Sequence, residues 1–168
     1  NTSRPVKVKF QNLKASEVDS GFRSFIQLQT GADIQISDST FQYLSSLESG
    51  AVLKAGSTKS TAHIFDSSFT NNSAVEAPVF VAEQESVVRC YRCSISHNFA
   101  IGSGAFKADS DSYFEIHEST VQLNSAKYAA VSEILSSQNP SVFSNSTLQD
   151  NRVLTRDEIE TTILTQGK

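Results

Sequence analysis

The chain contains 168 residues, a length that suits one domain. Its formal net charge of −4 argues against nucleic acid as a partner, because phosphate binding needs a clustered basic face. No apolar run approaches the length needed to cross a bilayer, so no direct membrane span is predicted. A charged fraction of 19%, with abundant Ser, Thr and Asn, favours a β-rich structure over a charged helical one.

The first part of the chain predicts short strands separated by turns. Residues 6–10 alternate apolar and other residues, which predicts a strand with one apolar face. Further strands are predicted within residues 21–29 and over residues 34–41, on either side of a turn at 30–33. Residues 54–59 contain a glycine and two lysines and predict an exposed loop.

The rest of the chain divides into similar units. Predicted units cover residues 62–86, the stretch around 93–106, and residues 113–138. A turn at Asn139 and Pro140 then precedes a last, incomplete unit. Residues 155–158 resemble a helix-capping box, so residues 155–168 are predicted to be a cap helix or a linker that follows repeats over 1–154.

Two short signals recur with a period of about 26 residues. In the first, an apolar anchor is followed three positions later by asparagine or leucine. Its copies are Phe41 with Leu44, Phe69 with Asn72, Ile95 with Asn98, Val121 with Asn124 and Leu148 with Asn151, with a weaker copy at Phe10 and Leu13. In the second, two small residues precede an apolar one, at 20–22, 50–52, 77–79, 104–106 and 129–131. Two registers with one period predict a repeat architecture.

Residues before each anchor alternate between apolar or small side chains and polar ones, as in strands with one buried face. Five positions before the anchors lie Ile36, Ile64, Cys90, Ile116 and Phe143. We therefore predict an all-β parallel β-helix of about five to six coils, in which like residues stack on like residues. Two inward columns are expected, one with Phe69, Ile95 and Val121 and one with Ile64, Cys90 and Ile116. A structural amide ladder is predicted for Asn72, Asn98, Asn124 and Asn151.

The paired signals resemble the repeats of polymorphic outer-membrane-type proteins and, more broadly, the right-handed parallel β-helices of the pectin-lyase-like superfamily. The resemblance extends from about Phe10 to Asn151. It implies right-handed coils, in agreement with the general preference of parallel crossovers. It also implies that a face rich in acids could bind calcium or act on a sugar chain, with a lysine or arginine as base.

One acidic cluster is therefore a catalytic candidate. Its members are Asp109, Asp111, Glu115, His117 and Glu118, with Lys107 as the nearest candidate base. However, Glu118 occupies the same repeated column as Asp38 and Asp66, and the two aspartates fall in a loop. We expect a solvated loop here, surface positions for His63 and His117, and no catalytic, cofactor-binding or metal-binding residues. The Ser and Thr column does not predict an ice-binding face, because the residues two positions away form no flat threonine array.

The two cysteines, Cys90 and Cys93, do not predict a zinc site, because none of the three histidines, His63, His97 and His117, falls at paired spacing with them. Both fall in inward columns, so the favoured interpretation is that they fill the core. The alternative is a local disulfide, which requires an oxidising compartment.

Three N-glycosylation acceptors occur, at Asn1, Asn71 and Asn145, and are compatible with secretion. A chain that begins at Asn1 without methionine predicts a processed chain or a segment of a larger protein. The expected location is extracellular or at the cell surface.

The predicted function is structural or adhesive, without chemistry of its own: a rigid spacer or a protein-interaction surface, and a glycoprotein if the acceptors are used. The alternative is a carbohydrate-active or carbohydrate-binding β-helix. Expected partners are glycans, other proteins, or further coils of the same protein at the open ends, where unpaired strand edges predict end-to-end association.

Overall fold

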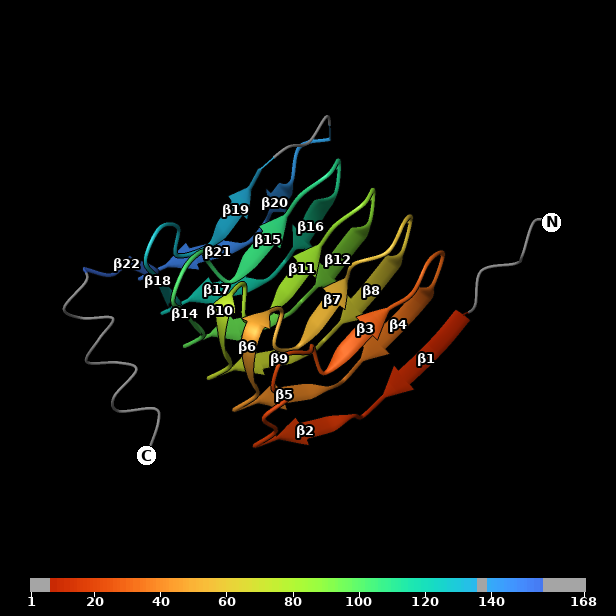
Figure 1. Cartoon of the computed structure of the whole chain (residues 1–168), viewed down its shortest axis with the longest axis horizontal. Helices are drawn as coiled ribbons and strands as arrows, with labels where there is room; N and C mark the ends of the chain where they lie inside the picture. The colour runs from red at the N-terminus through yellow and green to blue at the C-terminus, as the bar shows by residue number, and fades with distance from the viewer. Residues whose placement is uncertain (1–6, 136–138, 156–168) are drawn as a thin grey trace.

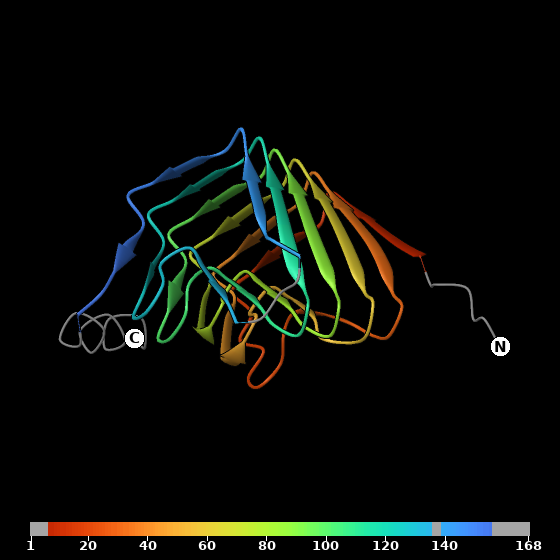
Figure 2. The ribbon, with the colours of Figure 1, turned by 90° about the horizontal axis from the view of Figure 1, so that it is seen from above.

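The computed structural model describes residues 7–135 and 139–155 and shows a parallel β-solenoid of about six turns (Figure 1). All regular structure in these residues is β-strand. Seen from above, the strands of successive coils lie side by side, and the coils follow one another from the N-terminal to the C-terminal end (Figure 2). The predicted fold class is confirmed. Most of the proposed capping box, 155–158, and the glycosylation acceptor Asn1 lie outside the described residues.

Four parallel sheets form the walls of the solenoid. Sheet A contains β1 (Lys7–Gln11), β4 (Asp33–Ser37), β8 (Thr61–Phe65), β12 (Val87–Tyr91), β16 (Tyr113–His117) and β20 (Val142–Ser144). Sheet B contains β2 (Lys14–Ser16), β5 (Thr40–Gln42), β9 (Ser68–Thr70), β13 (Ser94–Ser96), β17 (Thr120–Gln122) and β21 (Thr147–Gln149). Coils 1 to 6 are numbered here by the sheet A strand with which each begins.

The other two sheets complete each coil. Sheet C contains β6 (Ser45–Ser49), β10 (Ser73–Glu76), β14 (Phe99–Ala100), β18 (Ser125–Ala126) and β22 (Arg152–Val153). Sheet D contains β3 (Ile26–Leu28), β7 (Leu53–Ala55), β11 (Phe80–Ala82), β15 (Phe106–Ala108) and β19 (Ser132–Ile134). The loop predicted at 54–59 is therefore partly wrong, because its first two residues belong to β7 and only the rest forms a turn.

A corner divides the single strand predicted over residues 34–41. Strand β4 ends at Ser37 and β5 begins at Thr40, with Asp38 at the corner in the left-handed region (φ 51°). The same column repeats this conformation at Asp66, Arg92, Glu118 and Asn145. The polar residues of this column are thus corner residues. The alternation of apolar and polar residues continues through the corner, so it did not reveal that the chain changes direction between the two strands.

The predicted core columns are confirmed. Ile95 pairs with Phe69 on one side and Val121 on the other, and its side chain is fully buried. Cys90 likewise lies between Ile64 and Ile116. Large aromatic residues continue the first column, where the Phe41 and Phe69 rings stack with centroids 5.2 Å apart. Burial of these columns is the main stabilising contribution that the sequence makes to the fold.

The first coil was misaligned by the sequence signals. Phe10 pairs with Ile36, and Ala15 pairs with Phe41, so the first-coil anchor is Ala15 and not Phe10. The weak copy at Phe10 and Leu13 is therefore wrong. Ala15 lies 26 residues before Phe41, which fits the repeat better, but alanine lacks the size that marks the other anchors.

The second signal was also out of register at two places. Phe106 pairs with Phe80 and not with Val79, and Ile26 pairs with Leu53. The triplets at 20–22 and 104–106 are consequently displaced from their neighbours. In runs of glycine, alanine and valine, the side chains at neighbouring positions are too similar in size and polarity for the sequence pattern to define the strand register.

Gly104 occupies a position with no room for a larger residue. A Cβ atom there would lie 2.1 Å from the Ala129 carbonyl oxygen and 2.7 Å from the Val131 carbonyl carbon. Because these are backbone atoms of the next coil, Gly104→Ala is expected to lower the free energy of unfolding by about 1–3 kcal/mol, as overpacking does. Urea unfolding followed by circular dichroism measures the change. Gly56→Ala is the control, since its Cβ would meet the flexible Lys54 side chain at 2.8 Å; an equal loss in both variants would contradict the prediction.

Candidate functional site

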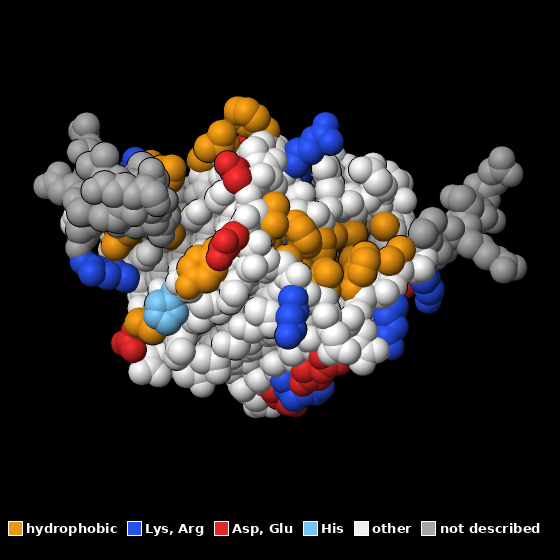
Figure 3. All heavy atoms as spheres, turned by 90° about the horizontal axis from the view of Figure 1, so that it is seen from below, with side chains coloured by type: hydrophobic (Ala, Val, Ile, Leu, Met, Phe, Trp, Pro, Cys, Tyr) orange, Lys and Arg blue, Asp and Glu red, His pale blue; other side chains and the backbone are white. Residues whose placement is uncertain are grey.

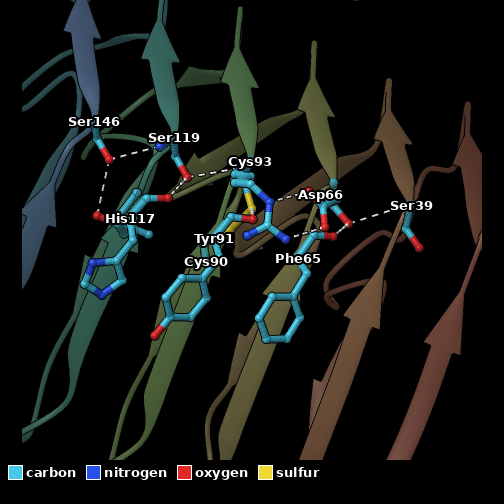
Figure 4. The surroundings of a disulfide bond; sticks show 12 residues. Ser39, Phe65, Asp66, Cys90, Tyr91, Cys93, His117, Ser119 and Ser146 are labelled. Atoms are coloured by element: carbon cyan, nitrogen blue, oxygen red, sulfur yellow. Dashed lines mark hydrogen bonds and ion pairs between the residues drawn. A yellow bond between two sulfur atoms is a disulfide. The ribbon is translucent and has the colours of Figure 1, made fainter.

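A row of planar side chains lies on the outer face of sheet A. Phe65, Tyr91 and His117 are the outward residues at the ends of β8, β12 and β16, where the register stacks them (Figure 4). The Phe65 and Tyr91 ring centroids are 5.3 Å apart and the Tyr91 and His117 centroids 4.8 Å apart, with interplanar angles of 12° and 15°. These values are typical of offset stacking. His117 lies at the surface, as predicted, but the row itself was not predicted.

Charged and polar groups follow the neighbouring outward column. The Arg89 guanidinium binds both carboxylate oxygens of Glu115, with Nε and Nη2 at 2.7 and 3.2 Å. This hydrogen bonding and the opposite charge raise the pKa of Arg89 despite its partial burial. His63 pairs with Arg89 in the register, and His117 Nδ1 lies 2.5 Å from Ser144 Oγ. The outer face of sheet A therefore combines rings, a guanidinium and a carboxylate within three adjacent coils.

The proposed catalytic cluster does not gather on one face. Lys107 lies on sheet D and binds Glu76 of the preceding coil, whereas Glu115 lies on sheet A and binds Arg89. Partial burial by itself lowers the pKa of Lys107. The hydrogen bond to Glu76 and the negative charge of that carboxylate together outweigh this effect, so the pKa of Lys107 is raised. Asp109 and Asp111 lie in the turn between these sheets. Among residues 7–135 and 139–155, no group of three or more acids, histidines and cysteines could hold a metal ion.

Cys90 and Cys93 form a disulfide across the corner between sheets A and B (Figure 4). Both side chains are buried in inward columns, as the sequence predicts, but the favoured interpretation of unpaired core cysteines is corrected to the local disulfide. The left-handed conformation of Arg92 at the corner turns the chain back and brings the two inward side chains together. Arg92 also binds Asp66 of the preceding coil through two 2.7 Å hydrogen bonds, which lower the pKa of Asp66.

The predicted asparagine ladder is present at the corner between sheets B and C. The Nδ2 groups of Asn72, Asn98 and Asn124 each donate to the Oδ1 atom of the next asparagine, at 2.9–3.0 Å. The four Nδ2 groups also donate to the anchor carbonyls of the preceding coil. Within the described residues, no fully buried side-chain nitrogen or oxygen lacks a hydrogen-bond partner.

A second ladder, of serine hydroxyl groups, was missed. At the corner between sheets A and B, the backbone N–H groups of Ser39, Cys93 and Ser119 donate to the hydroxyl of the next coil, at 3.0–3.1 Å. From the sequence, this column was predicted only to hold small side chains. The recurrence of serine instead of alanine was the available signal, because only serine supplies an acceptor to the buried corner amides.

Two of the glycosylation acceptors occupy corners. Asn145 is exposed and Asn71 is partly exposed, both with left-handed backbone conformations (φ 49° and 55°). Glycosylation at these positions stays a prediction.

Apolar side chains reach the surface in separate groups, some of which are visible in Figure 3. At the N-terminal end these are Val8, Phe10, Phe22 and Phe25, and in the last coils they are Ile134, Leu135, Val142, Leu148 and Val153. The counterparts of Val8, Phe10, Ile134, Leu148 and Val153 are buried in the middle coils, so these end positions lack the neighbouring coil that covers their counterparts.

Comparisons with protein-family models, with curated proteins and with solved structures give no match for this chain. In the part of the chain that the structure describes, no helix is long and apolar enough to span a membrane.

Proposed function

We propose that the chain is a non-catalytic scaffold, a rigid spacer or protein-interaction surface within a larger extracellular or cell-surface protein. The observation that carries the proposal is the coil-to-coil pairing of four parallel sheets, with a register shift between β6 and β10, around a filled interior. An interior filled by its own side chains presents its chemistry on outer faces and ends. The resemblance to pectin-lyase-like β-helices and outer-membrane-type repeats belongs to the same proposal.

Charged side chains support a scaffold role because they join neighbouring coils. Cross-coil ion pairs among the described residues include Lys7 with Asp33, Lys54 with Glu83, Lys59 with Glu85, Arg89 with Glu115, Arg92 with Asp66 and Lys107 with Glu76. Candidate catalytic groups such as Glu115 and Lys107 are thereby engaged in cross-coil contacts. The Cys90–Cys93 disulfide supports an extracellular or surface location, because disulfides persist in oxidising compartments.

Two measurements on the whole chain test this proposal. Hydrogen exchange is expected to show strong and similar protection in coils 3, 4 and 5, since a rigid solenoid opens first at its ends. A panel of neutral and acidic polysaccharides is expected to show no lyase or hydrolase turnover. Turnover that disappears in Asp111→Ala, or a middle coil that exchanges as fast as the ends, would overturn the scaffold assignment.

A carbohydrate-binding face is the second candidate, and the aromatic row of Phe65, Tyr91 and His117 favours it. Aromatic rings next to charged groups such as the Arg89–Glu115 pair can contact both the apolar and the hydroxyl groups of a sugar. Binding of a polysaccharide that Tyr91→Ala removes and Tyr43→Ala preserves would establish this function. Tyr43 is a suitable control because it is 54% exposed at a different corner.

A further inference from the structure

The two polar ladders have a direction. In the asparagine ladder, the backbone N–H and Nδ2 of Asn98 both donate to Oδ1 of Asn124, which lies one coil nearer the C-terminus. In the serine ladder, the backbone N–H of Ser119 donates to Oγ of Ser146, again one coil further on. Where the following coil carries serine or asparagine at these positions, its side chain accepts from the corner N–H group. Among the described residues, Ser67 and Val18 lack this bond, because the following coil carries Cys93 and Leu44 there.

Coil 6 carries the last described serine and asparagine of the two ladders, Ser146 and Asn151. Asn151 Oδ1 accepts two hydrogen bonds from Asn124, at 2.9 and 3.1 Å, and Ser146 Oγ accepts one from Ser119. Among the described residues, no acceptor binds the backbone N–H groups of Ser146 and Asn151. The two corners of coil 6 on either side of β21 thus each present one donor that a following coil would satisfy.

Apolar side chains beside these donors also lack a covering layer. Leu148 is 51% exposed and Val153 is 55% exposed, whereas their counterparts Val121 and Ala126 in coil 5 are fully buried. Strands β21 and β22 are edge strands of sheets B and C. A ligand that covers this end must therefore be an extended strand that pairs with β21 and β22. It must carry apolar side chains toward the core and two hydrogen-bond acceptors for the N–H groups of Ser146 and Asn151.

The N-terminal coil of a second copy cannot supply those acceptors. Leu13 occupies the serine position of coil 1, since its N–H donates to Ser39 Oγ. Val18 occupies the asparagine position, because its carbonyl accepts from Ser45 as the Asn72 carbonyl accepts from Phe99. Head-to-tail stacking of two copies would bury the N–H groups of Ser146 and Asn151 against aliphatic side chains, which is unfavourable. The ladders therefore select against the end-to-end association that the open edges alone predict.

We propose that the C-terminal end of the solenoid, formed by β20, β21 and β22, docks a strand segment of a partner protein that carries serine and asparagine five residues apart around an apolar residue. The partner serine accepts from the N–H of Ser146, and the partner asparagine accepts from Asn151 through Oδ1. Its own Nδ2 donates to the Leu148 carbonyl, as Asn151 does to Val121 at 2.8 Å. This inference deepens the proposed scaffold function and rests on it.

A peptide with the sequence of residues 113–126 is the probe, because it contains β16 and β17 with Ser119 and Asn124 at the required spacing. Fluorescence anisotropy with the whole chain measures binding. The peptide is expected to bind saturably, and the same peptide with Asn124→Leu at least about tenfold more weakly, the equivalent of about 1.4 kcal/mol for one lost buried hydrogen-bonding group.

Two protein variants locate the site. Asn151→Leu is expected to weaken binding of the unmodified peptide and to reduce the difference between the two peptides, because the Nδ2 donor is lost while the backbone N–H remains, as at Leu44. Lys14→Gln, an exposed substitution on edge strand β2 at the opposite end, is expected to leave both affinities unchanged. Sedimentation of the whole chain is expected to show a monomer.

Failure of the peptide to bind, equal affinity of the two peptides, or loss of binding in Lys14→Gln would overturn the docking site. Head-to-tail oligomers that persist in Asn151→Leu would overturn the selection against a second copy. The scaffold function is tested by different measurements, hydrogen exchange and polysaccharide turnover. A failure of the docking site can therefore be distinguished from a failure of the scaffold function.

Discussion

Asn98→Ala is expected to lower the free energy of unfolding by about 3–5 kcal/mol, because it leaves several buried polar groups without partners at once. Asn98 Oδ1 accepts from the backbone N–H and the Nδ2 of Asn72, both at 3.0 Å. Its Nδ2 donates to the Phe69 carbonyl at 3.0 Å and to Asn124 Oδ1 at 2.9 Å. The side chain is only 1% exposed, so water does not replace these bonds. Urea unfolding followed by far-ultraviolet circular dichroism measures the loss.

Asn151→Ala is the matched control for this prediction. It removes the same kinds of hydrogen bond, but at the last rung of the ladder, where the groups are only partly buried and water reaches them. A clearly smaller loss is expected there. If both variants lost the same stability, the cost would not arise from buried, unsatisfied groups.

Ile95→Ala is expected to destabilise the solenoid by about 2–5 kcal/mol, as large-to-small changes at buried positions do. Its side chain is fully buried between Phe69 and Val121, and both neighbours belong to the same column. Strands fixed above and below prevent the coil from collapsing into the cavity, which keeps the cost toward the upper part of this range.

Leu47→Ala provides the comparison for the core substitution. Leu47 is 60% exposed on coil 2, so its truncation removes little buried area and is expected to change the unfolding midpoint only slightly. Thermal and urea unfolding of the two variants, measured side by side, decide the matter. A similar loss in both would mean that the Phe69–Ile95–Val121 column is not the core of the fold.

The columns that could be predicted well from the sequence hold the same type of side chain in successive coils. Asn72, Asn98 and Asn124 are identical, and the anchors beside them are all large and apolar, so their common period was visible. Coil 1 lacked this identity, because Ala15 is small and Val18 replaces the asparagine. The larger Phe10 therefore attracted the alignment, five residues from the true anchor.

The aromatic row was missed for a different reason. Phe65, Tyr91 and His117 belong to three classes on a hydropathy scale, yet they share a planar ring, which is the property that stacking uses. The disulfide could be posed only as an alternative, since spacing alone does not reveal that the left-handed Arg92 corner brings Cys90 and Cys93 together. Both features depend on which side chains face one another across or along coils.

The constant spacing of strand partners has a kinetic consequence. Paired residues in sheet B, such as Phe41 with Phe69 or Ile95 with Val121, lie only 28 or 26 residues apart, and each inner strand pairs with one strand of the preceding coil and one of the following coil. No strand pairing joins distant parts of the described chain. Folding can therefore start at any well-packed pair of coils and spread in both directions, each added coil closing a loop of nearly the same length. The coils from 3 to 5, which contain the asparagine ladder and the aromatic row of Phe65, Tyr91 and His117, are the natural place for that start.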